Sequence, residues 1–235
     1  VWITGDDVTN SGQVSARSDS TAAGGRITLM ADLQRGEARV GGTLDASSAG
    51  GDGGFIETSG SRVKLAGDAR ITTAAPQGRT GTWLIDPTDF NVAASGGDLT
   101  GAQLSTQLAS NNVTIASTAG AGGVLGDVNI ADSVSWSANQ LTLNAQNNIS
   151  VTQPMTGTGT ATLRLEFGQG AVATGNLSTY SITAAVNLPS GASFTTKQGN
   201  NGTDVAYTVI NTLAELQAID TTTTTRSGNW ALGSD

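Results

Sequence analysis

Two carboxylates form the most suggestive chemical pair in this sequence. Asp86 and Asp89 lie on either side of Pro87. Paired carboxylates can act as general acid and general base when a cleft gives them different pKa values. The run Asp-Pro-Thr-Asp is also typical of a turn in which side-chain oxygens accept backbone N–H groups. We favour the turn and assign neither residue a catalytic role.

Metal binding has one candidate segment. The segment from Gly50 to Ile56 is rich in glycine, like the calcium-binding nonapeptide Gly-Gly-x-Gly-x-Asp, but Phe55 stands at the position of its Asp. A tight glycine turn is therefore the better interpretation. Other acidic residues are too scattered to predict a coordination set. We predict no metal site and no cofactor. The scattered residues include Asp127, Asp132 and Asp204.

Missing residue types exclude further chemistry. The chain of 235 residues contains neither Cys nor His. Disulfides, zinc sites built from Cys and His, and Ser-His-Asp or Cys-His catalytic centres are therefore excluded. An exposed Trp could stack on a sugar, whereas a buried Trp fills a core, and we expect Trp83 to be buried. The four tryptophans are Trp2, Trp83, Trp136 and Trp230.

Asn-X-Ser/Thr sequons occur about as often as chance predicts for this composition, so they predict no modification. The sequons begin at Asn112, Asn148, Asn176 and Asn201.

The distribution of charge narrows the range of partners. The formal net charge is −8, and of the 11 Lys and Arg residues only Arg164, Lys197 and Arg226 follow residue 80. No stretch holds a basic cluster, which disfavours nucleic acid as a partner. An acidic chain is repelled by anionic membrane surfaces, and no apolar run approaches the ~20 residues that span a bilayer. We expect no nucleic-acid partner and no membrane insertion.

The elements that would position these residues are short strands in a repeating pattern. Runs of small and β-branched residues recur in groups of three through residues 1–92. Their period of about 28 residues is typical of a solenoid. Equivalent apolar positions are Val14, Leu44 and Ile71 in one series, and Ile27, Ile56 and Leu84 in another.

The runs predict strands and not helices. Apolar residues alternate with polar ones, as in Val63-Lys64-Leu65, and Gly, Asp and Ser bound each run. Three strands per repeat fit a three-sided coil in which each strand pairs with its equivalents above and below. The 32 Gly residues then mark corners, and the 4% of aromatic residues fits a narrow core of Val, Ile, Leu and Ala. We predict an all-β parallel β-helix with one or two short flanking helices.

Residues 93–125 interrupt this repeat. Leu104 and Leu108 are four residues apart, which predicts a short amphipathic helix against the side of the solenoid. A strand is expected to follow at residues 113–115.

Residues 126–235 are expected to form further coils. Leu141 and Leu163 are 22 residues apart, which indicates shorter coils. The asparagines between residues 144 and 148 could stack as a ladder at a turn. Thr212 followed by Glu215 is a capping box, which predicts a helix near residues 212–219. The threonine run at 221–225 is compatible with a loop or with a β-prone segment.

Two motifs resemble a known family. One is Gly53-Gly-Phe-Ile-Glu-Thr-Ser-Gly60 followed by Gly78-Arg-Thr-Gly-Thr-Trp-Leu-Ile-Asp-Pro-Thr-Asp-Phe90. The other is Tyr207-Thr-Val-Ile-Asn-Thr-Leu-Ala-Glu-Leu-Gln217 with Gly228-Asn-Trp-Ala-Leu-Gly-Ser-Asp235. They resemble segments of bacterial two-partner secretion exoproteins, the filamentous haemagglutinin-like and high-molecular-weight-type adhesins. The run Trp-Leu-Ile-Asp-Pro-Thr-Asp-Phe is fairly specific to them.

The resemblance implies a right-handed parallel β-helix that leaves the cell through a dedicated outer-membrane transporter. Such proteins are secreted or displayed on the bacterial surface, where they mediate adhesion to host cells, aggregation or biofilm cohesion. Asn-Pro-Asn-type motifs of the family's secretion domain are missing, so this segment is expected to lie downstream of it. The chain begins within a strand-like run at Val1, and we expect it to be part of a longer protein.

The sequence is therefore interpreted as a stiff, non-enzymatic adhesin segment whose partners are host-cell surfaces, neighbouring cells or extracellular polysaccharide. A specific binding module for a glycan or a haem carrier is the first alternative. A polysaccharide-degrading β-helix enzyme is less favoured, because such enzymes cluster Asp, Arg or Lys on one face. Exposed strand edges at both coil ends predict end-to-end association unless other segments cover them.

Overall fold

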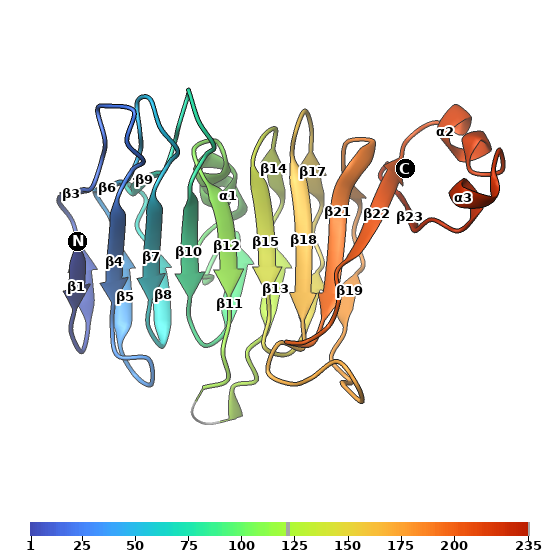
Figure 1. The fold of residues 1–235 in the computed structure, drawn as a ribbon. Coiled ribbons are helices and arrows are strands. Elements are labelled where there is room, and N and C mark those ends of the chain that lie inside the picture. The colour runs from blue at the N-terminus through green and yellow to red at the C-terminus, as the bar shows by residue number, and fades with distance from the viewer. Residues whose placement is uncertain (121–122, 235) are drawn as a thin grey trace.

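The computed structural model describes residues 1–120 and 123–234, and most of them form a parallel β-solenoid of about seven turns (Figure 1). Each turn contributes strands to separate faces, and each strand pairs in parallel with its equivalents in neighbouring turns. The predicted all-β parallel solenoid is confirmed. Residues 121 and 122, within the expected interruption, lie outside the described residues.

One long sheet runs the length of the solenoid. Its strands are parallel from β1 to β21, one from each successive turn. In spatial order the sheet contains β1 (Trp2–Thr4), β4 (Arg26–Met30), β7 (Phe55–Ser59), β10 (Thr82–Asp86), β12 (Asn112–Ala116), β15 (Gln140–Asn144), β18 (Thr162–Phe167), β21 (Gly191–Gln198), β22 (Val205–Ile210) and β23 (Trp230–Leu232).

The second and third faces are each divided between an N-terminal and a C-terminal sheet. The N-terminal sheets are β2 (Val8–Asn10), β5 (Glu37–Val40) and β8 (Arg62–Leu65) on the second face, and β3 (Gln13–Ser15), β6 (Thr43–Asp45) and β9 (Arg70–Thr72) on the third. The C-terminal sheets are β11 (Phe90–Ala93), β13 (Val128–Ala131), β16 (Ile149–Val151) and β19 (Tyr180–Ile182), and β14 (Val134–Trp136), β17 (Met155–Gly157) and β20 (Val186–Asn187).

The register of the coils agrees with one predicted series. Val14 pairs with Leu44, and Leu44 pairs with Ile71, as their spacing predicts. Leu141 pairs with Leu163, so this coil has the short length that the spacing indicates.

The other series is shifted by one residue. Ile27 pairs with Ile56, but Ile56 then pairs with Trp83 and not with Leu84. Leu84 lies opposite Glu57 on the outer side of the sheet. A shift of one residue exchanges the two faces of a strand, and here the large indole occupies the core.

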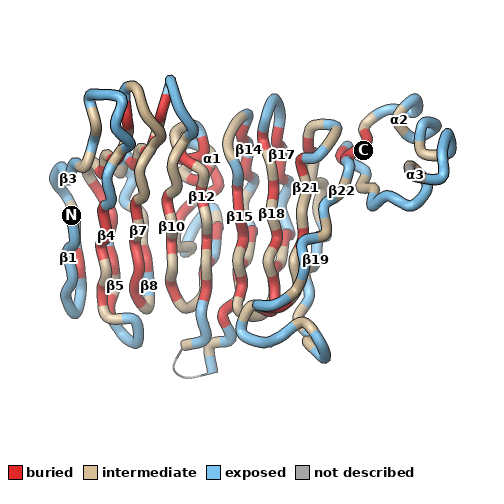
Figure 2. The backbone as a smooth tube through the Cα atoms, viewed as in Figure 1, coloured by how far each residue is buried: buried red, intermediate tan, exposed pale blue. Residues whose placement is uncertain are grey.

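Buried residues alternate with less buried ones along the strands (Figure 2), and the side chains of the buried residues form a core that runs along the solenoid. In β10, Trp83 and Ile85 are fully buried, which confirms the expectation for Trp83. Its Nε1 donates a hydrogen bond of 3.1 Å to Oγ1 of Thr58, which is also fully buried. Full burial of an aliphatic core side chain such as that of Ile85 stabilises the fold by roughly 1.5–3 kcal/mol.

A column of glycines marks one corner of the solenoid. Gly25, Gly54 and Gly81 directly precede β4, β7 and β10 and are stacked in register. A Cβ atom on Gly54 would lie 2.0 Å from the carbonyl oxygen of Gly25, and one on Gly81 would lie 2.0 Å from that of Gly54. The neighbouring backbones therefore leave no room for a side chain at Gly54 or Gly81.

Helix α1 (Gly101–Leu108) takes the place of a strand on the third face, between β9 and β14 (Figure 1). The sequence predicts an amphipathic helix here, against the side of the solenoid, and α1 does lie on one face with Ala102 and Thr106 exposed. Because it replaces a strand, Leu104 and Leu108 are fully buried in the common core. Thr100 and Gln103 form a capping box that fixes where the helix begins.

Side-chain amides near the end of this helix replace the missing strand partners of β9. Gln107 Oε1 accepts from the backbone N–H of Ile71 (3.3 Å), and Asn111 Nδ2 donates to the carbonyl of Ile71 (2.9 Å). Asn111 Oδ1 also accepts from the hydroxyl of Thr73 (2.9 Å). Asn111 is fully buried. The two amides thus satisfy backbone groups that would otherwise be unpaired.

On the second face, the segment that links β11 to α1 folds back and lies in space between β8 and β11. The carbonyl of Asp98 accepts from the N–H of Leu65, and the N–H of Asp98 donates to the carbonyl of Asn91. Among the described residues, the long sheet that begins at β1 is consequently the only sheet whose strand ladder continues from the third turn into the fourth.

Residues 205–234 differ from the expected further coils. Strand β22 is antiparallel to β21, so the chain leaves the coil path, and β23 then pairs with β22. Helix α2 (Leu213–Ala218) begins at the predicted capping box of Thr212 and Glu215. The threonine run forms part of a short helix, α3 (Thr223–Arg226).

Apolar residues are exposed at the N-terminal end of the solenoid. β1 is an edge strand of the long sheet, and the side chains of Val1, Trp2 and Ile3 are exposed, with Trp2 at 74%. The expected open strand edge is present at this end.

Candidate functional site

The two carboxylates of the candidate acid-base pair have separate environments. Asp89 Oδ1 accepts backbone N–H groups of Gly126 (3.0 Å) and Asp127 (2.8 Å), which belong to the next coil. Asp127 Oδ1 accepts from the N–H of Asn148 in the same way (2.9 Å), and Asn148 Oδ1 accepts from Thr179 (2.8 Å). These side chains form a ladder from coil to coil, so Asp89 has a structural role.

Asp86 ends β10 and is partly buried. Burial raises the pKa of its carboxyl, and the nearby charge of Glu57 raises this pKa further. Its Oδ1 is buried without a hydrogen-bond partner. A charged carboxylate in such a place destabilises the folded state, because no donor replaces the water that it loses.

We therefore expect Asp86→Asn to stabilise the protein at neutral pH. Because the pKa of Asp86 is raised in the folded protein, the unfolded chain ionises this carboxyl at lower pH than the folded chain does. The free energy of unfolding therefore falls as the pH rises from the ordinary pKa of 3.8 through the raised value. Thermal unfolding between pH 3 and pH 8 would show that the stability of Asp86→Asn relative to wild type increases as the pH rises.

The matched control is Asp52→Asn. Hydrogen bonds from Arg79 lower the pKa of the Asp52 carboxyl, so this change is expected to act in the opposite direction as the pH rises. A constant difference between Asp86→Asn and wild type at every pH would contradict the assignment.

The remaining acidic candidates also have protein partners. Asp52, in the glycine-rich segment, pairs with Arg79. Asp132 accepts from the N–H of Gly101 at the start of α1 (2.8 Å), and Asp204 pairs with Arg164. Among the described residues, no three acidic side chains gather as cation ligands.

All four sequon asparagines form side-chain hydrogen bonds in the fold. Asn112 Nδ2 donates to the carbonyl of Thr80, and Asn176 Nδ2 donates to that of Gly168, each at 2.8 Å. Asn148 belongs to the ladder described above. Asn201 lies at an exposed turn, where its Oδ1 accepts from the backbone N–H of Ala173 (2.8 Å).

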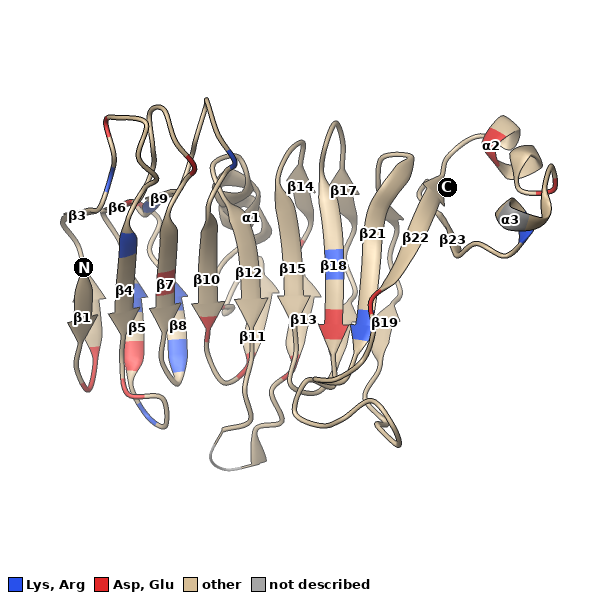
Figure 3. Cartoon of the chain, viewed as in Figure 1, with Lys and Arg blue, Asp and Glu red and all other residues tan. Residues whose placement is uncertain are grey.

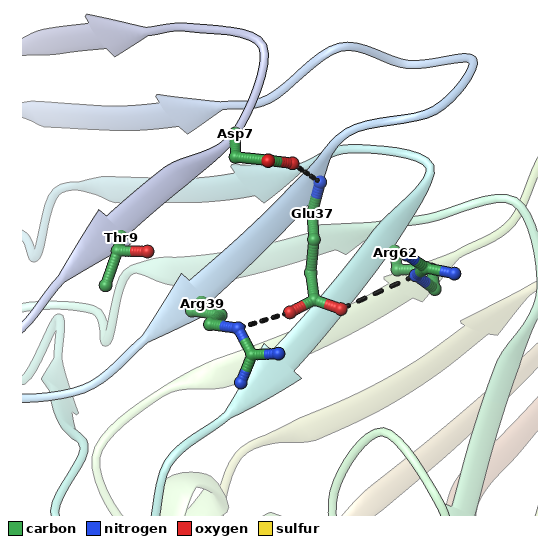
Figure 4. A pocket seen from close by; sticks show the side chains of 5 residues that line it. All are labelled: Asp7, Thr9, Glu37, Arg39 and Arg62. Carbon is green, nitrogen blue, oxygen red and sulfur yellow. Dashed lines mark hydrogen bonds and ion pairs between the residues drawn. The ribbon is translucent and has the colours of Figure 1, made fainter.

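A polar hollow on the second face gathers charged side chains from successive turns (Figure 4). Glu37 projects between Arg39 and Arg62. Its Oε1 lies 2.5 Å from Nε of Arg39, and its Oε2 lies 3.4 Å from Nε of Arg62. The side chain of Glu37 is only 15% exposed, whereas those of Arg39 and Arg62 are 66% and 64% exposed. The hollow has a volume of about 270 Å³ and is lined by Asp7, Thr9, Glu37, Arg39 and Arg62.

A second hollow of about 230 Å³ adjoins the first and shares Thr9 and Arg39 with it. Its lining adds Lys64, which pairs with Asp98 at 2.8 Å, and the apolar surface of Leu65. We call the two hollows together the Glu37 groove. The second hollow is lined by Thr9, Asn10, Ser11, Arg39, Gly41, Lys64, Leu65, Ala66 and Asp68.

The sequence alone does not reveal this groove, because its residues are far apart along the chain. The signal that could have revealed it is the coil period. Glu37 pairs with Arg62 and Arg39 pairs with Lys64 in adjacent strands, so the repeat brings scattered charges onto one face (Figure 3).

An apolar hollow of about 230 Å³ lies at the C-terminal end of the solenoid. Tyr180 and Phe194 line it from the last coil, and Val209 and Leu232 line it from the segment that follows. This segment covers the core only in part, because Leu232 is itself exposed.

None of the helices in the described residues has the length and apolar character needed to cross a membrane. Comparisons with models of protein families, with curated proteins and with solved structures find no match to this chain.

Proposed function

We propose that this chain is a rigid structural segment of a secreted bacterial adhesin of the two-partner secretion type. It would pass an outer-membrane transporter as part of a longer protein. Outside the cell it would hold binding surfaces away from the bacterium, its own outer faces among them. Its partners would be host-cell surfaces, neighbouring bacteria or extracellular polysaccharide, and it would perform no catalysis.

The observation that carries this proposal is the continuous long sheet from β1 to β21. Its ladders join each turn to the next, so backbone hydrogen bonds run along the axis of the solenoid. Solenoids of this kind are built by contacts between neighbouring repeats and present extended surfaces. Such a surface suits multivalent contact, in which weak interactions along a rod add avidity.

A ligand-binding module is the second candidate function, and the Glu37 groove favours it. An enzyme has less support, since Asp89, Asp127, Asp132 and Asp204 all make structural bonds.

We expect beads coated with the full chain to adhere to epithelial cells, to bacteria or to immobilised polysaccharide. Avidity requires many copies, so retention under flow should rise steeply with coating density. Beads coated with a cysteine-free globular protein of similar net charge serve as the control. Retention no higher than that of the control on all three surfaces would contradict the proposal.

A further inference from the structure

Two arginines of the Glu37 groove form ion pairs with one carboxylate. Arg39 and Arg62 each approach the same carboxylate through Nε, and that carboxylate is largely buried. An ion pair made at Nε leaves the terminal Nη1 and Nη2 groups of each guanidinium as a fork of donors. Both side chains are about two-thirds exposed, so the forks can reach a molecule in the solvent.

Acceptors and apolar surface lie beside these donors. Asp7 lines the first hollow and accepts the backbone N–H of Glu37 with Oδ1 (2.8 Å), so its Oδ2 remains as a second acceptor. Thr9 adds a hydroxyl shared by both hollows. Leu65 and Ala66 add apolar surface in the second hollow. Donors, acceptors and C–H surface together match a sugar ring, which carries hydroxyls at its edge and C–H groups on its faces.

The charge balance favours a neutral ligand. The lining of the groove contains three acidic and three basic side chains, and the whole chain has a net charge of −8. A polyanion would therefore meet no excess of positive charge and would be repelled at longer range. The charged residues of the lining are Asp7, Glu37, Asp68, Arg39, Arg62 and Lys64.

The dimensions favour a chain of sugars. Ligand pockets for drug-sized molecules have volumes of roughly 300–1,000 Å³, and each hollow here is smaller. Each is suited to about one ring, and the two hollows join at Arg39 on an open face. We propose that the Glu37 groove binds adjacent sugar units of a neutral polysaccharide, with Arg39 donating to hydroxyls in both hollows. This inference rests on the proposed adhesive function and names a ligand class for it.

The test is calorimetric titration of the full chain with soluble dextran, mannan and galactan, and with polygalacturonate as the polyanion. We expect at least one neutral polysaccharide to bind, and Arg39→Lys to weaken that binding about tenfold, because lysine keeps the charge beside Glu37 but loses the fork. The matched control, Arg79→Lys, replaces an exposed arginine that pairs with Asp52 outside the groove, and its affinity should equal that of wild type.

Three results would overturn the inference: no binding of any neutral polysaccharide, binding of polygalacturonate alone, or wild-type affinity in both Arg39→Lys and Arg62→Lys. Far-UV circular dichroism establishes that each variant is folded. Bead adhesion separates this inference from the proposed function. If beads coated with Arg39→Lys adhere as well as beads coated with wild type, the groove is not the adhesive site. If wild-type beads fail to adhere, the proposed adhesive function itself is contradicted.

Discussion

Replacement of Gly54 by alanine is expected to destabilise the fold by at least about 3 kcal/mol. The added Cβ would lie 2.0 Å from the carbonyl oxygen of Gly25 in the previous coil. Real atoms do not approach so closely, so the two coils must separate or shift. Such a shift would strain the hydrogen bonds that join β4, β7 and β10. Urea unfolding, followed by tryptophan fluorescence, to which the buried Trp83 and Trp136 contribute, measures the loss.

The same substitution at Gly67 is the control for this prediction. A Cβ there would meet no heavy atom within 4 Å, and this glycine does not have a positive φ. Gly67→Ala is therefore expected to leave stability unchanged or to raise it by up to about 1 kcal/mol, because alanine restricts the unfolded chain. Equal urea midpoints for the two variants would show that the glycine column tolerates side chains.

Asn111→Leu is expected to cost about 2–5 kcal/mol of stability. Leucine has a similar size but can neither donate to the carbonyl of Ile71 nor accept from the hydroxyl of Thr73. Each buried polar group left without a partner costs about 1–3 kcal/mol. The loss should appear as a lower urea midpoint and as faster amide hydrogen exchange in β9, the strand that α1 covers.

Asn200→Leu provides the same chemical change at an exposed turn. It is expected to alter the free energy of unfolding by no more than about 0.5 kcal/mol. If Asn111→Leu were equally mild, water or a rearranged backbone would have to replace the lost amide, and the role assigned to Asn111 would be wrong.

Local sequence patterns were sufficient to predict most of the coil strands. The alternation in Val63-Lys64-Leu65 and the glycines before each run correspond to strand and corner positions in the structure. Pairing partners were harder to predict, because adjacent apolar residues such as Trp83 and Leu84 could each face inward. Trp83, the larger of the two, faces the core, and its fit there depends on the space that the neighbouring coils leave.

The position of α1 could not be predicted from its own residues. Leu104 and Leu108 indicate an apolar helix face, but two leucines are compatible with a helix on the solenoid as well as within it. The amides of Gln107 and Asn111 indicate that α1 lies next to β9 only once β9 is known to need hydrogen-bond partners. Similarly, the charges of the Glu37 groove come together through the register of β5 and β8.

The replacement of a strand by α1 also gives the solenoid a mechanical weak point. Between the third and fourth turns, one ladder continues while the other two faces rely on side chains and a short connection. Tension along the axis would concentrate at this seam, and the pair β7–β10 would carry most of it. The solenoid would then yield first at this seam, and the coils on each side of it would stay folded at that force.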